Sequence, residues 1–269
     1  MIGITLAVYN KLEYTKLCLE SLHNNLPPQS HVVVVDNASS DGTAHYLSSL
    51  QWLSVIFNKE NLGCAPAWNQ GVQKVDGEEW TVILNNDIIL TEGWWSGLML
   101  AAECHKLDIV SPAIREGELN YEISSYAREF TSSMANVIRN DTAHAVCFAV
   151  RRNVFNTIGN FDENFKIGQY EDTDFFRRAR IAGFRLGSTG GAFVHHFGSV
   201  TQQALKKRVP GYALENKAYF VRKWKLSWWQ RALERNRDKL FNRFSCFHER
   251  LRFGHSLVEK MIQGKLRYY

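Results

Sequence analysis

Strand-like and helix-like segments alternate through the first 90 residues, and this alternation constrains the fold more than any other feature of the sequence. Apolar, β-branched runs occupy residues 2–8, 31–35, 54–57 and 81–84, and helical spacing of apolar residues covers 14–23, 43–50 and 65–75. A chain that alternates in this way builds a mostly parallel sheet with helices on its faces. We therefore expect an α/β fold with a Rossmann-like sheet.

A short polar cluster follows each predicted strand. The clusters are Tyr9-Asn10, Asp36-Asn37, Asn61 to Gly63 and Asn85 to Asp87. In a parallel sheet the segments after the strands meet at one edge, and ligands bind there. The pattern indicates a nucleotide-type ligand. Because the sequence contains neither GxGxxG nor GxxxxGK(S/T), a dinucleotide-dependent oxidoreductase and a P-loop NTPase are disfavoured.

The segment Thr81 to Leu90, TVILNNDIIL, brings a carboxylate to the end of a buried strand. Hard divalent cations take oxygen ligands and bind diphosphates together with one or two protein carboxylates. Asp87 is therefore a candidate metal ligand. The alternative is a tight turn, because Asn85, Asn86 and Asp87 favour turns through local hydrogen bonds.

A second polar centre lies in Gly168 to Arg178, GQYEDTDFFRR, where Glu171, Asp172 and Asp174 open a predicted helix. Negative charge at a helix N-terminus is favoured by the macrodipole, so the acids have a purely structural explanation. Like charges this close also raise at least one pKa, which suits a general base.

The middle of the chain is less regular. A helix is predicted over 94–104, strands over 109–111 and 145–150, and a short helix over 151–158, whereas 115–140 shows no clear period. A final strand over 193–198 carries His195 and His196, which point to opposite faces of that strand, so one of them faces the site in either register.

Composition indicates a globular protein, with 45% hydrophobic and 13% aromatic residues in 269. Five cysteines without a CxxC pair suit a reducing cytosol and argue against structural zinc or a disulfide scaffold. The start resembles a strand and not a signal peptide. No apolar run approaches the roughly 18 residues of a membrane span. We expect a cytoplasmic protein.

The two parts of the chain differ in charge. Residues 203–269 contain 17 Lys and Arg against 5 Asp and Glu, whereas residues 1–202 contain 15 against 22. An amphipathic helix with apolar residues at Leu233, Leu240, Phe244, Phe247 and Leu251 is predicted there, preceded by Trp224, Trp228 and Trp229. A basic, aromatic helix of this kind suits the inner, anionic face of the plasma membrane. The alternatives are packing on the main domain or a homodimer; nucleic acid is disfavoured, because no recognition motif is present.

The first 200 residues resemble glycosyltransferase family 2, the inverting enzymes with the GT-A fold, and within it the rhamnosyltransferase-like branch of bacterial surface polysaccharide biosynthesis. The matching pieces are AVYNKLEYTKLCLESL at 7–22, VVVDNASSDGT at 33–43, NKENLGCAPAWNQG at 58–71, LNNDIIL at 84–90, IGNFDENF at 158–165, YEDTDFFRRARIAGFR at 170–185 and VHHFGSVT at 194–201. The resemblance implies a GT-A catalytic domain over 1–202 and a helical, basic C-terminal appendage over 203–269.

The resemblance also implies roles for individual residues. Asp172 corresponds to the catalytic base, with Glu171 and Asp174 supporting it. Asp87 corresponds to the ligand of Mg²⁺ or Mn²⁺, assisted by His195 or His196. The implied nucleotide site consists of Ala7, Tyr9, Asp36, Asn61, Gly63, Asn85 and Asn86. Asn85 and Asn86 replace acids found in many relatives, so this motif carries less negative charge, and no QxxRW motif of processive polymerases follows.

The implied reaction moves a sugar from a nucleotide-sugar donor, such as dTDP-rhamnose or a UDP-sugar, to a hydroxyl of a glycan or lipid-linked saccharide. One carboxylate takes the proton of the acceptor, and a cation stabilises the departing nucleoside diphosphate. Two alternatives remain. A sugar nucleotidyltransferase begins with a Gly-rich basic loop that Ala7 to Asn10 lacks, and a non-catalytic sugar-binding protein would explain the Asn-rich motif.

Overall fold

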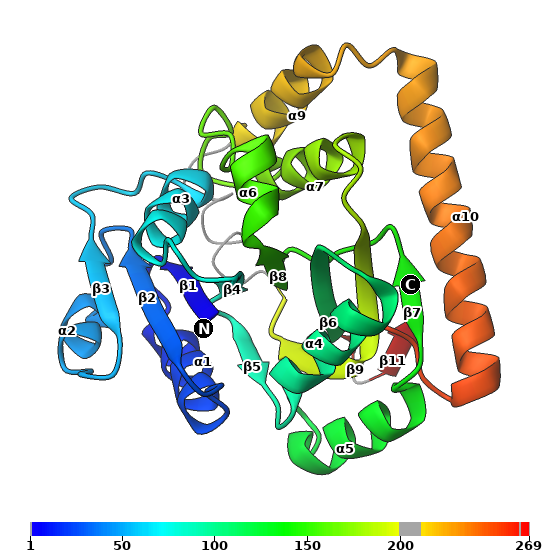
Figure 1. Ribbon diagram of the computed structural model, residues 1–269, viewed down its shortest axis with the longest axis horizontal. Coiled ribbons are helices and arrows are strands. Elements are labelled where there is room, and N and C mark those ends of the chain that lie inside the picture. Colours follow the sequence, from blue (N-terminus) through cyan, green and yellow to red (C-terminus); the bar gives the residue numbers. More distant parts are fainter. Residues whose placement is uncertain (1, 199–210, 264, 269) are drawn as a thin grey trace.

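The first 90 residues form the predicted alternation of strands and helices. The computed structural model describes residues 2–198, 211–263 and 265–268 (Figure 1). The first elements are β1 (Ile2–Val8), α1 (Leu12–Asn24), β2 (Ser30–Asp36), α2 (Thr43–Ser48), β3 (Ser54–Phe57), α3 (Cys64–Lys74) and β4 (Trp80–Asn85). The apolar runs of the sequence become the buried strands, and the polar clusters follow them.

The parallel strands bring the predicted polar clusters to one edge. β1 pairs in parallel with β2 on one side and with β4 on the other, so Val8 lies beside Asp36 and Ala7 beside Asn85. β3 extends the sheet beyond β2, also in parallel. The clusters after β1, β2 and β4 therefore lie together at the carboxyl edge, as predicted.

The rest of the sheet is mixed. The following elements are β5 (Ile88–Leu90), α4 (Trp94–His105), β6 (Ile109–Glu116), α5 (Ile123–Met134), β7 (Ile138–Asn140), β8 (Cys147–Arg151), α6 (Arg152–Ile158), α7 (Glu171–Ile181) and β9 (Leu186–His196). β8 lies antiparallel between β4 and β6, and β9 pairs with β5, β6 and β7. The unassigned region 115–140 thus contains the end of β6, α5 and β7.

Helices cover both faces of the sheet. One buried cluster joins the strands to Leu19 of α1 and Leu98 of α4, and a second joins them to Trp68 of α3 and Phe175 of α7. α3 packs closely on β1. Gly71 of α3 lies so near Thr5 of β1 that a Cβ at this position would overlap with the Thr5 side chain. Truncating a core ring such as Phe175 to Ala would cost about 3–5 kcal/mol. The two clusters fix both faces of the carboxyl edge.

The tail differs from the helical appendage that the sequence predicts. It contains α9 (Tyr212–Lys223), α10 (Trp228–Phe253), β10 (Val258–Ile262) and β11 (Lys265–Tyr268). α10 covers the predicted amphipathic segment, but β10 pairs in parallel with β6 and carries β11 antiparallel to itself, so the end of the tail belongs to the main sheet. The proposed boundary at 202/203 lies outside the described residues, and so does the end of the 194–201 motif. No helix in the described ranges is long and apolar enough to cross a membrane.

Candidate active site

The carboxyl ends of β1 and β2 form one side of the candidate site. Asp36, the last residue of β2, is 2% exposed, and its Oδ1 accepts a hydrogen bond from the Ser39 amide at 3.2 Å. Burial raises the pKa of Asp36, against the effect of the Ser39 hydrogen bonds. Ala7 and Tyr9, at the end of β1, are partly exposed beside it. The arrangement presents a buried carboxylate with a partly open rim.

The loop after β1 is tied to the loop after β2. The Asn10 amide donates to Ser39 Oγ at 2.7 Å, and the Ser40 amide donates to Asn10 Oδ1 at 2.7 Å. Asn10 has a positive φ of 54°, a conformation that Asn tolerates better than most residues. These bonds hold the two loops at a fixed distance around Asp36.

Asn61 and Gly63 shape the turn before α3. Asn61 Oδ1 accepts from the Gly63 amide at 2.9 Å, and the Cys64 amide donates to the Ile167 carbonyl at 2.8 Å. Gly63 has φ 94°, and a Cβ there would lie 2.9 Å from the Ile167 nitrogen. Only glycine permits this approach, which brings the loop before α7 against the N-terminus of α3.

Asp87 lies between β4 and β5, 3% exposed, within 3.5 Å of His196. His196 Nδ1 lies 3.6 Å from Glu116, so the imidazole is between two carboxylates. Burial lowers the pKa of His196, but Asp87 and Glu116 outweigh it and raise this pKa to about 9. The hydrogen bond from His196, together with Lys260, overcomes burial and lowers the pKa of Glu116 to about 2. Asp87 is therefore held beside a positive charge at neutral pH.

The first turn of α7 supplies two more acids. Glu171 is 3% exposed, and its Oε2 has no hydrogen-bond partner among the described residues. Burial and the Asp172 charge raise the pKa of Glu171 to about 8. Burial also raises the pKa of Asp172, against hydrogen bonds from Thr173. Both groups are better proton acceptors than ordinary carboxylates.

Asp174 differs from its two neighbours. Its carboxylate is fully buried and accepts from Arg178 at 2.8 Å and from Trp224 Nε1 at 3.0 Å, with Lys223 at 2.7 Å. Such a group anchors α7 to α9 and holds its charge in ion pairs. The three acids of the motif thus divide into a pair with raised pKa values and one structural ion-pair partner.

Asp87, which follows β4, and the first two acids of α7 lie near the start of α3. The charges of Glu171, Asp172 and Asp87 all act on the thiol of Cys64, whose pKa is raised well above its ordinary value, chiefly by burial. Cys64 is the first residue of α3. The two acidic centres of the sequence are therefore neighbours in space around the start of α3.

Comparison with known proteins identifies the family. The model of "Glycosyl transferase family 2" matches residues 4–183, more than half of the chain. The chain belongs to glycosyl transferase family 2. A Rickettsia typhi protein, "Uncharacterized glycosyltransferase RT0329", is 22% identical over 187 residues, which cover 62% of this chain and 55% of that protein. The chain thus spans about half the length of this curated relative.

Solved structures show that this family 2 chain has a GT-A fold. "Mannosyltransferase PcManGT from Pyrobaculum calidifontis in complex with GDP-Man and Mn2+" matches with a TM-score of 0.58 at 17% identity, over 82% of this chain and 64% of that one. Staphylococcus aureus TarS 1-349 in complex with UDP-GlcNAc matches with a TM-score of 0.56 at 18% identity, over 72% of this chain and 58% of that one.

Two of the implied site residues point elsewhere in this family 2 chain. Asn86 is buried, and its amide donates to Thr15 Oγ1 of α1 at 2.9 Å. His195 is buried on the opposite face of β9 from His196 and lies 2.9 Å from the Tyr121 hydroxyl. Burial, with His196 and Arg115, lowers the pKa of His195 to about 4. Asn85 ends β4 beside Ala7 and is partly exposed, so it stays at the edge.

Asn216 of α9 was not predicted as a site residue. Its Nδ2 donates to the carbonyls of Lys166, Gly168 and Gln169, and its Oδ1 accepts from the Lys166 amide. These bonds hold the segment just before Glu171, where Ile167, Gln169 and Tyr170 have positive φ. The available signal was the position of Asn216, four residues after Tyr212 and four before Phe220, on the buried face of α9.

The donor set at Asp87 fits a hard divalent cation that is shared with a diphosphate. Asp87 is a carboxylate at the site edge, and the orphaned Glu171 Oε2 shows that this region holds more acceptors than donors. No group of three His, Cys, Asp or Glu in the described ranges forms a closed metal site. A cation that retains waters and takes phosphate oxygens needs only one or two carboxylates. His196 is bound to Asp87 as a charged partner, which disfavours it as a ligand.

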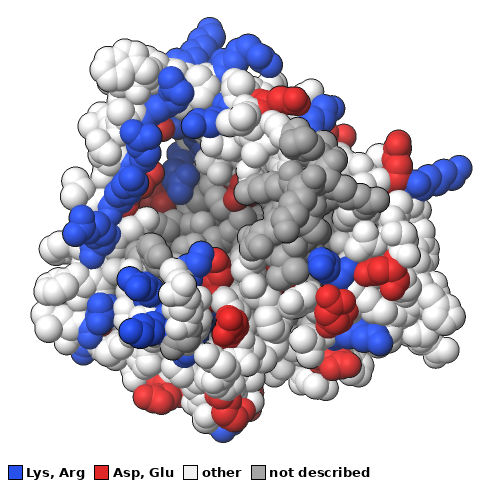
Figure 2. Space-filling view, turned by 180° about the vertical axis from the view of Figure 1, so that it is seen from behind, with Lys and Arg blue, Asp and Glu red and all other residues white. Residues whose placement is uncertain are grey.

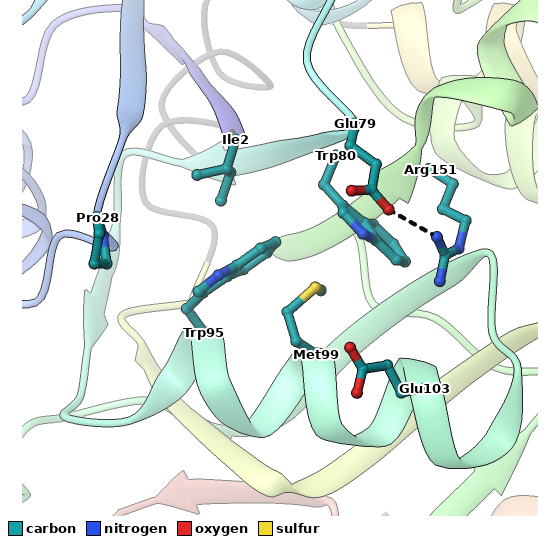
Figure 3. Close-up of a pocket in the computed structure, with 8 residues that line it drawn as sticks. All are labelled: Ile2, Pro28, Glu79, Trp80, Trp95, Met99, Glu103 and Arg151. Atoms are coloured by element: carbon teal, nitrogen blue, oxygen red, sulfur yellow. Dashed lines mark hydrogen bonds and ion pairs between the residues drawn. The ribbon is translucent and has the colours of Figure 1, made fainter.

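A separate cavity of about 220 Å³ lies at the other edge of the sheet (Figure 3). It is lined by Ile2, Pro28, Glu79, Trp80, Trp95, Met99, Glu103 and Arg151. Ile2 and Trp80 begin β1 and β4, so this cavity lies at the amino ends of the parallel strands. It is not part of the acidic site.

Proposed function

We propose that this family 2 protein transfers a sugar, with inversion, from a nucleotide-sugar donor to a hydroxyl of a glycan or lipid-linked saccharide. The observation that carries the proposal is the meeting of Asp87 with Glu171 and Asp172 around the start of α3, at the carboxyl edge that also holds Asp36. The solved relatives named above, which share the fold, were crystallised with GDP-Man and Mn2+ or with UDP-GlcNAc.

The donor would bind along the carboxyl edge. Ala7, Tyr9 and Asp36 would contact the nucleoside, because the partly open rim at β1 and β2 leaves room for a flat base beside a buried acceptor. Asn61, Gly63 and Asn85 would contact the diphosphate or sugar, since Gly63 directly precedes Cys64 at the start of α3 and Asn85 ends β4 beside Ala7. Asn86, whose amide donates a hydrogen bond to Thr15 of α1, would hold the turn after β4 in place.

Asp172 would act as the general base. Its carboxylate takes the proton from the acceptor hydroxyl as the acceptor oxygen bonds to the anomeric carbon. The bond from that carbon to the diphosphate oxygen breaks with its electron pair, which gives inversion and a nucleoside diphosphate. Burial raises the pKa of Asp172 and would give the base its high proton affinity. Glu171, whose own pKa is raised to about 8 by burial and by the Asp172 charge, would support the base as its neighbour in the first turn of α7.

Asp87 would hold Mg²⁺ or Mn²⁺ together with the diphosphate. A bound divalent cation supplies charge stabilisation for the leaving group. His196 lies 3.5 Å from the Asp87 carboxylate and would hold it in place. Partial neutralisation by His196 predicts weak metal binding until the donor adds its phosphates.

The finer assignments are a rhamnosyltransferase-like activity with dTDP-rhamnose and a role in bacterial surface polysaccharide biosynthesis. They rest on the sequence motifs alone. An acceptor at the inner face of the plasma membrane, and a homodimer, are further proposals about partners.

A screen of nucleotide sugars against the purified full-length chain tests the proposal. Release of nucleoside diphosphate is measured for dTDP-, UDP- and GDP-sugars with each metal, with and without saccharide acceptors. We expect one donor to be turned over faster when an acceptor is present. Binding of a donor without turnover under any of these conditions would instead favour a sugar-binding protein.

A further inference from the structure

α10 is a long helix, and no other described part of the chain covers its middle. It runs for 26 residues and begins at a capping box formed by Ser227 and Gln230. Every residue from 235 to 244 is exposed, and the helix runs along one side of the molecule (Figure 1). Its buried residues, Cys246 and Glu249, lie near its C-terminal end. The helix therefore needs another surface to cover its apolar side chains.

An apolar stripe runs along the exposed part of this helix. Leu233, Leu240, Phe244, Phe247 and Leu251 lie on one face and are between 63% and 77% exposed. Trp228, Trp229 and Phe241 are also exposed on the same helix. A soluble monomer rarely exposes apolar side chains in such a row, and rows of this kind mark interaction surfaces. The alternative in which the stripe packs on the main domain is therefore wrong for this structure.

Basic residues lie beside the stripe and around the rest of the helix. They are Arg231, Arg235, Arg237, Lys239, Arg243, Arg250 and Arg252. Figure 2 shows a row of Lys and Arg side chains along the left edge, the side that α10 occupies in the reverse view of Figure 1. All three acids of α10 are engaged, Glu234 with Arg177, Asp238 with Arg237 and Glu249 with Arg139. The surface presented outward is thus apolar and positive.

The C-terminal end of α10 is held rigidly to the sheet. Arg139 of β7 makes two 2.7 Å bonds to the Glu249 carboxylate and a 2.9 Å bond to Ser256 Oγ, all in the interior. Glu249 also accepts from the Leu257 amide at 3.0 Å. A bidentate, buried ion pair fixes direction as well as position. We call these residues the Arg139 clamp; it holds α10 with its stripe outward.

We propose that α10 binds an anionic lipid surface, with the stripe at the acyl boundary and the flanking cations among the headgroups. An amphipathic helix with a basic polar face and aromatic residues binds in this way. A second copy of the chain fits less well, because it would bring the same row of positive charge against the first. The inference goes beyond sugar transfer, and only its usefulness, access to a lipid-linked acceptor, depends on the proposed function.

Cosedimentation with vesicles tests the proposal. The full-length protein is mixed with vesicles of phosphatidylcholine containing phosphatidylglycerol, and with vesicles of phosphatidylcholine alone. We expect binding to the anionic vesicles that is at least tenfold stronger than to the neutral ones and that weakens with salt. No binding to anionic vesicles at low salt would overturn the proposal.

Two matched variants locate the contact. Phe244→Glu with Phe247→Glu puts charge into the stripe, and Leu100→Glu with Ile181→Glu puts the same charge at equally exposed positions on α4 and α7. We expect the first to lose binding at least tenfold and the second to retain it within threefold. Circular dichroism confirms that both are folded. Equal loss in both variants would overturn the assignment to α10.

A third variant and a mass measurement separate the remaining outcomes. Arg237→Ser with Arg243→Ser should weaken binding to anionic vesicles several-fold and leave the stripe intact. Light scattering reports the oligomeric state. If the wild type is a dimer that the stripe variant disrupts, and the wild type does not bind vesicles, the partner of the stripe is a second copy of the chain and not lipid. Donor binding measured without vesicles is expected to be unchanged in all variants, so failure here is distinct from failure of the proposed transferase activity.

Discussion

Glu171 and Glu249 are equally buried carboxylates with opposite surroundings. Glu249 accepts hydrogen bonds from Arg139, Ser256 and Leu257, whereas Glu171 has an oxygen without a partner in the described chain and a pKa raised to about 8. Removing a charge from water without a partner is costly. A fully paired buried acid stabilises the structure, whereas an unpaired buried acid beside a second acid with a raised pKa marks a candidate catalytic site. The difference separates the acids of this chain into two roles.

Removal of divalent metal should have the largest effect, because Asp87 and the diphosphate would lose their cation. Turnover in excess EDTA should fall by a factor on the order of 10³ or more, since the cation contributes several kcal/mol to leaving-group stabilisation. Activity is measured as nucleoside diphosphate release, with Mn²⁺ or Mg²⁺ added back as the control. Full activity in EDTA would leave His196, the positive charge beside Asp87, to neutralise the diphosphate.

Asp172→Asn should reduce transfer by about 10² to 10⁴, the usual share of a general base. The amide matches the carboxylate in shape, so donor affinity measured by calorimetry should survive. Asp238→Asn, the same change at an exposed position on α10, is the control and should stay within about threefold of wild type. A rate near wild type for Asp172→Asn would move the role to Glu171.

Glu249→Gln should act on stability and not on chemistry. It leaves Arg139 as an uncompensated buried charge, so the free energy of unfolding should fall by about 3–5 kcal/mol. The double variant Arg139→Met with Glu249→Leu removes both charges and should recover much of that loss. Urea unfolding followed by circular dichroism measures both. A double variant no more stable than Glu249→Gln would mean that the clamp contributes more than its charges.

Asn216→Ala should loosen the segment that carries the base. We expect kcat to fall by up to about 10²-fold, because small misplacements of a catalytic group are costly, with little change in donor affinity. The accompanying loss of stability should be about 1–3 kcal/mol. Asn216→Asp keeps the acceptor to Lys166 and removes the donors, so it separates the two sides of this contact. Equal loss of donor affinity and kcat would indicate a general structural role.

The pH dependence of stability should show the smallest effect. In the folded chain the pKa of Glu171 is raised to about 8, from an ordinary value of 4.5. Between pH 4.5 and about pH 8 the folded chain therefore binds a proton that the unfolded chain has released. Stability therefore falls as pH rises through this window. Glu171→Gln should flatten this fall between about pH 5 and pH 8 in thermal unfolding without metal. An unchanged slope would show that another group supplies it.

Local sequence patterns predicted the parallel half of the fold well. β1 to β4 have nearly the predicted limits, because their apolar runs and the polar residues after them are local features. The pairing of β10 with β6 joins Val258 to Ile114, and no local period reports such a distant partner. β8 was predicted as a strand, but its antiparallel direction depends on the chain path before it.

The site could be predicted to the level of motifs. Asp87, Glu171 and Asp172 meet around Cys64, in agreement with their positions at the ends of predicted elements. His195 points away because side chains alternate along β9, and the register is set by pairing that the sequence does not contain. Asn86 lies in the bend between β4 and β5, where its amide donates to Thr15 of α1. Asn216 escaped prediction because its partners are backbone groups of a distant loop.

Because β10 pairs with β6, the end of the tail is part of the main sheet. Without residues beyond 202, the end of β6 from Ile114 to Glu116 would present unpaired backbone groups to solvent. Exposed strand edges of this kind recruit other chains and aggregate. Among the described residues, β11 is the outermost strand on this side of the sheet, where Lys265 and Arg267 place charge at the edge and discourage such pairing. The tail thus protects β6 of the preceding domain from pairing with the strands of other chains.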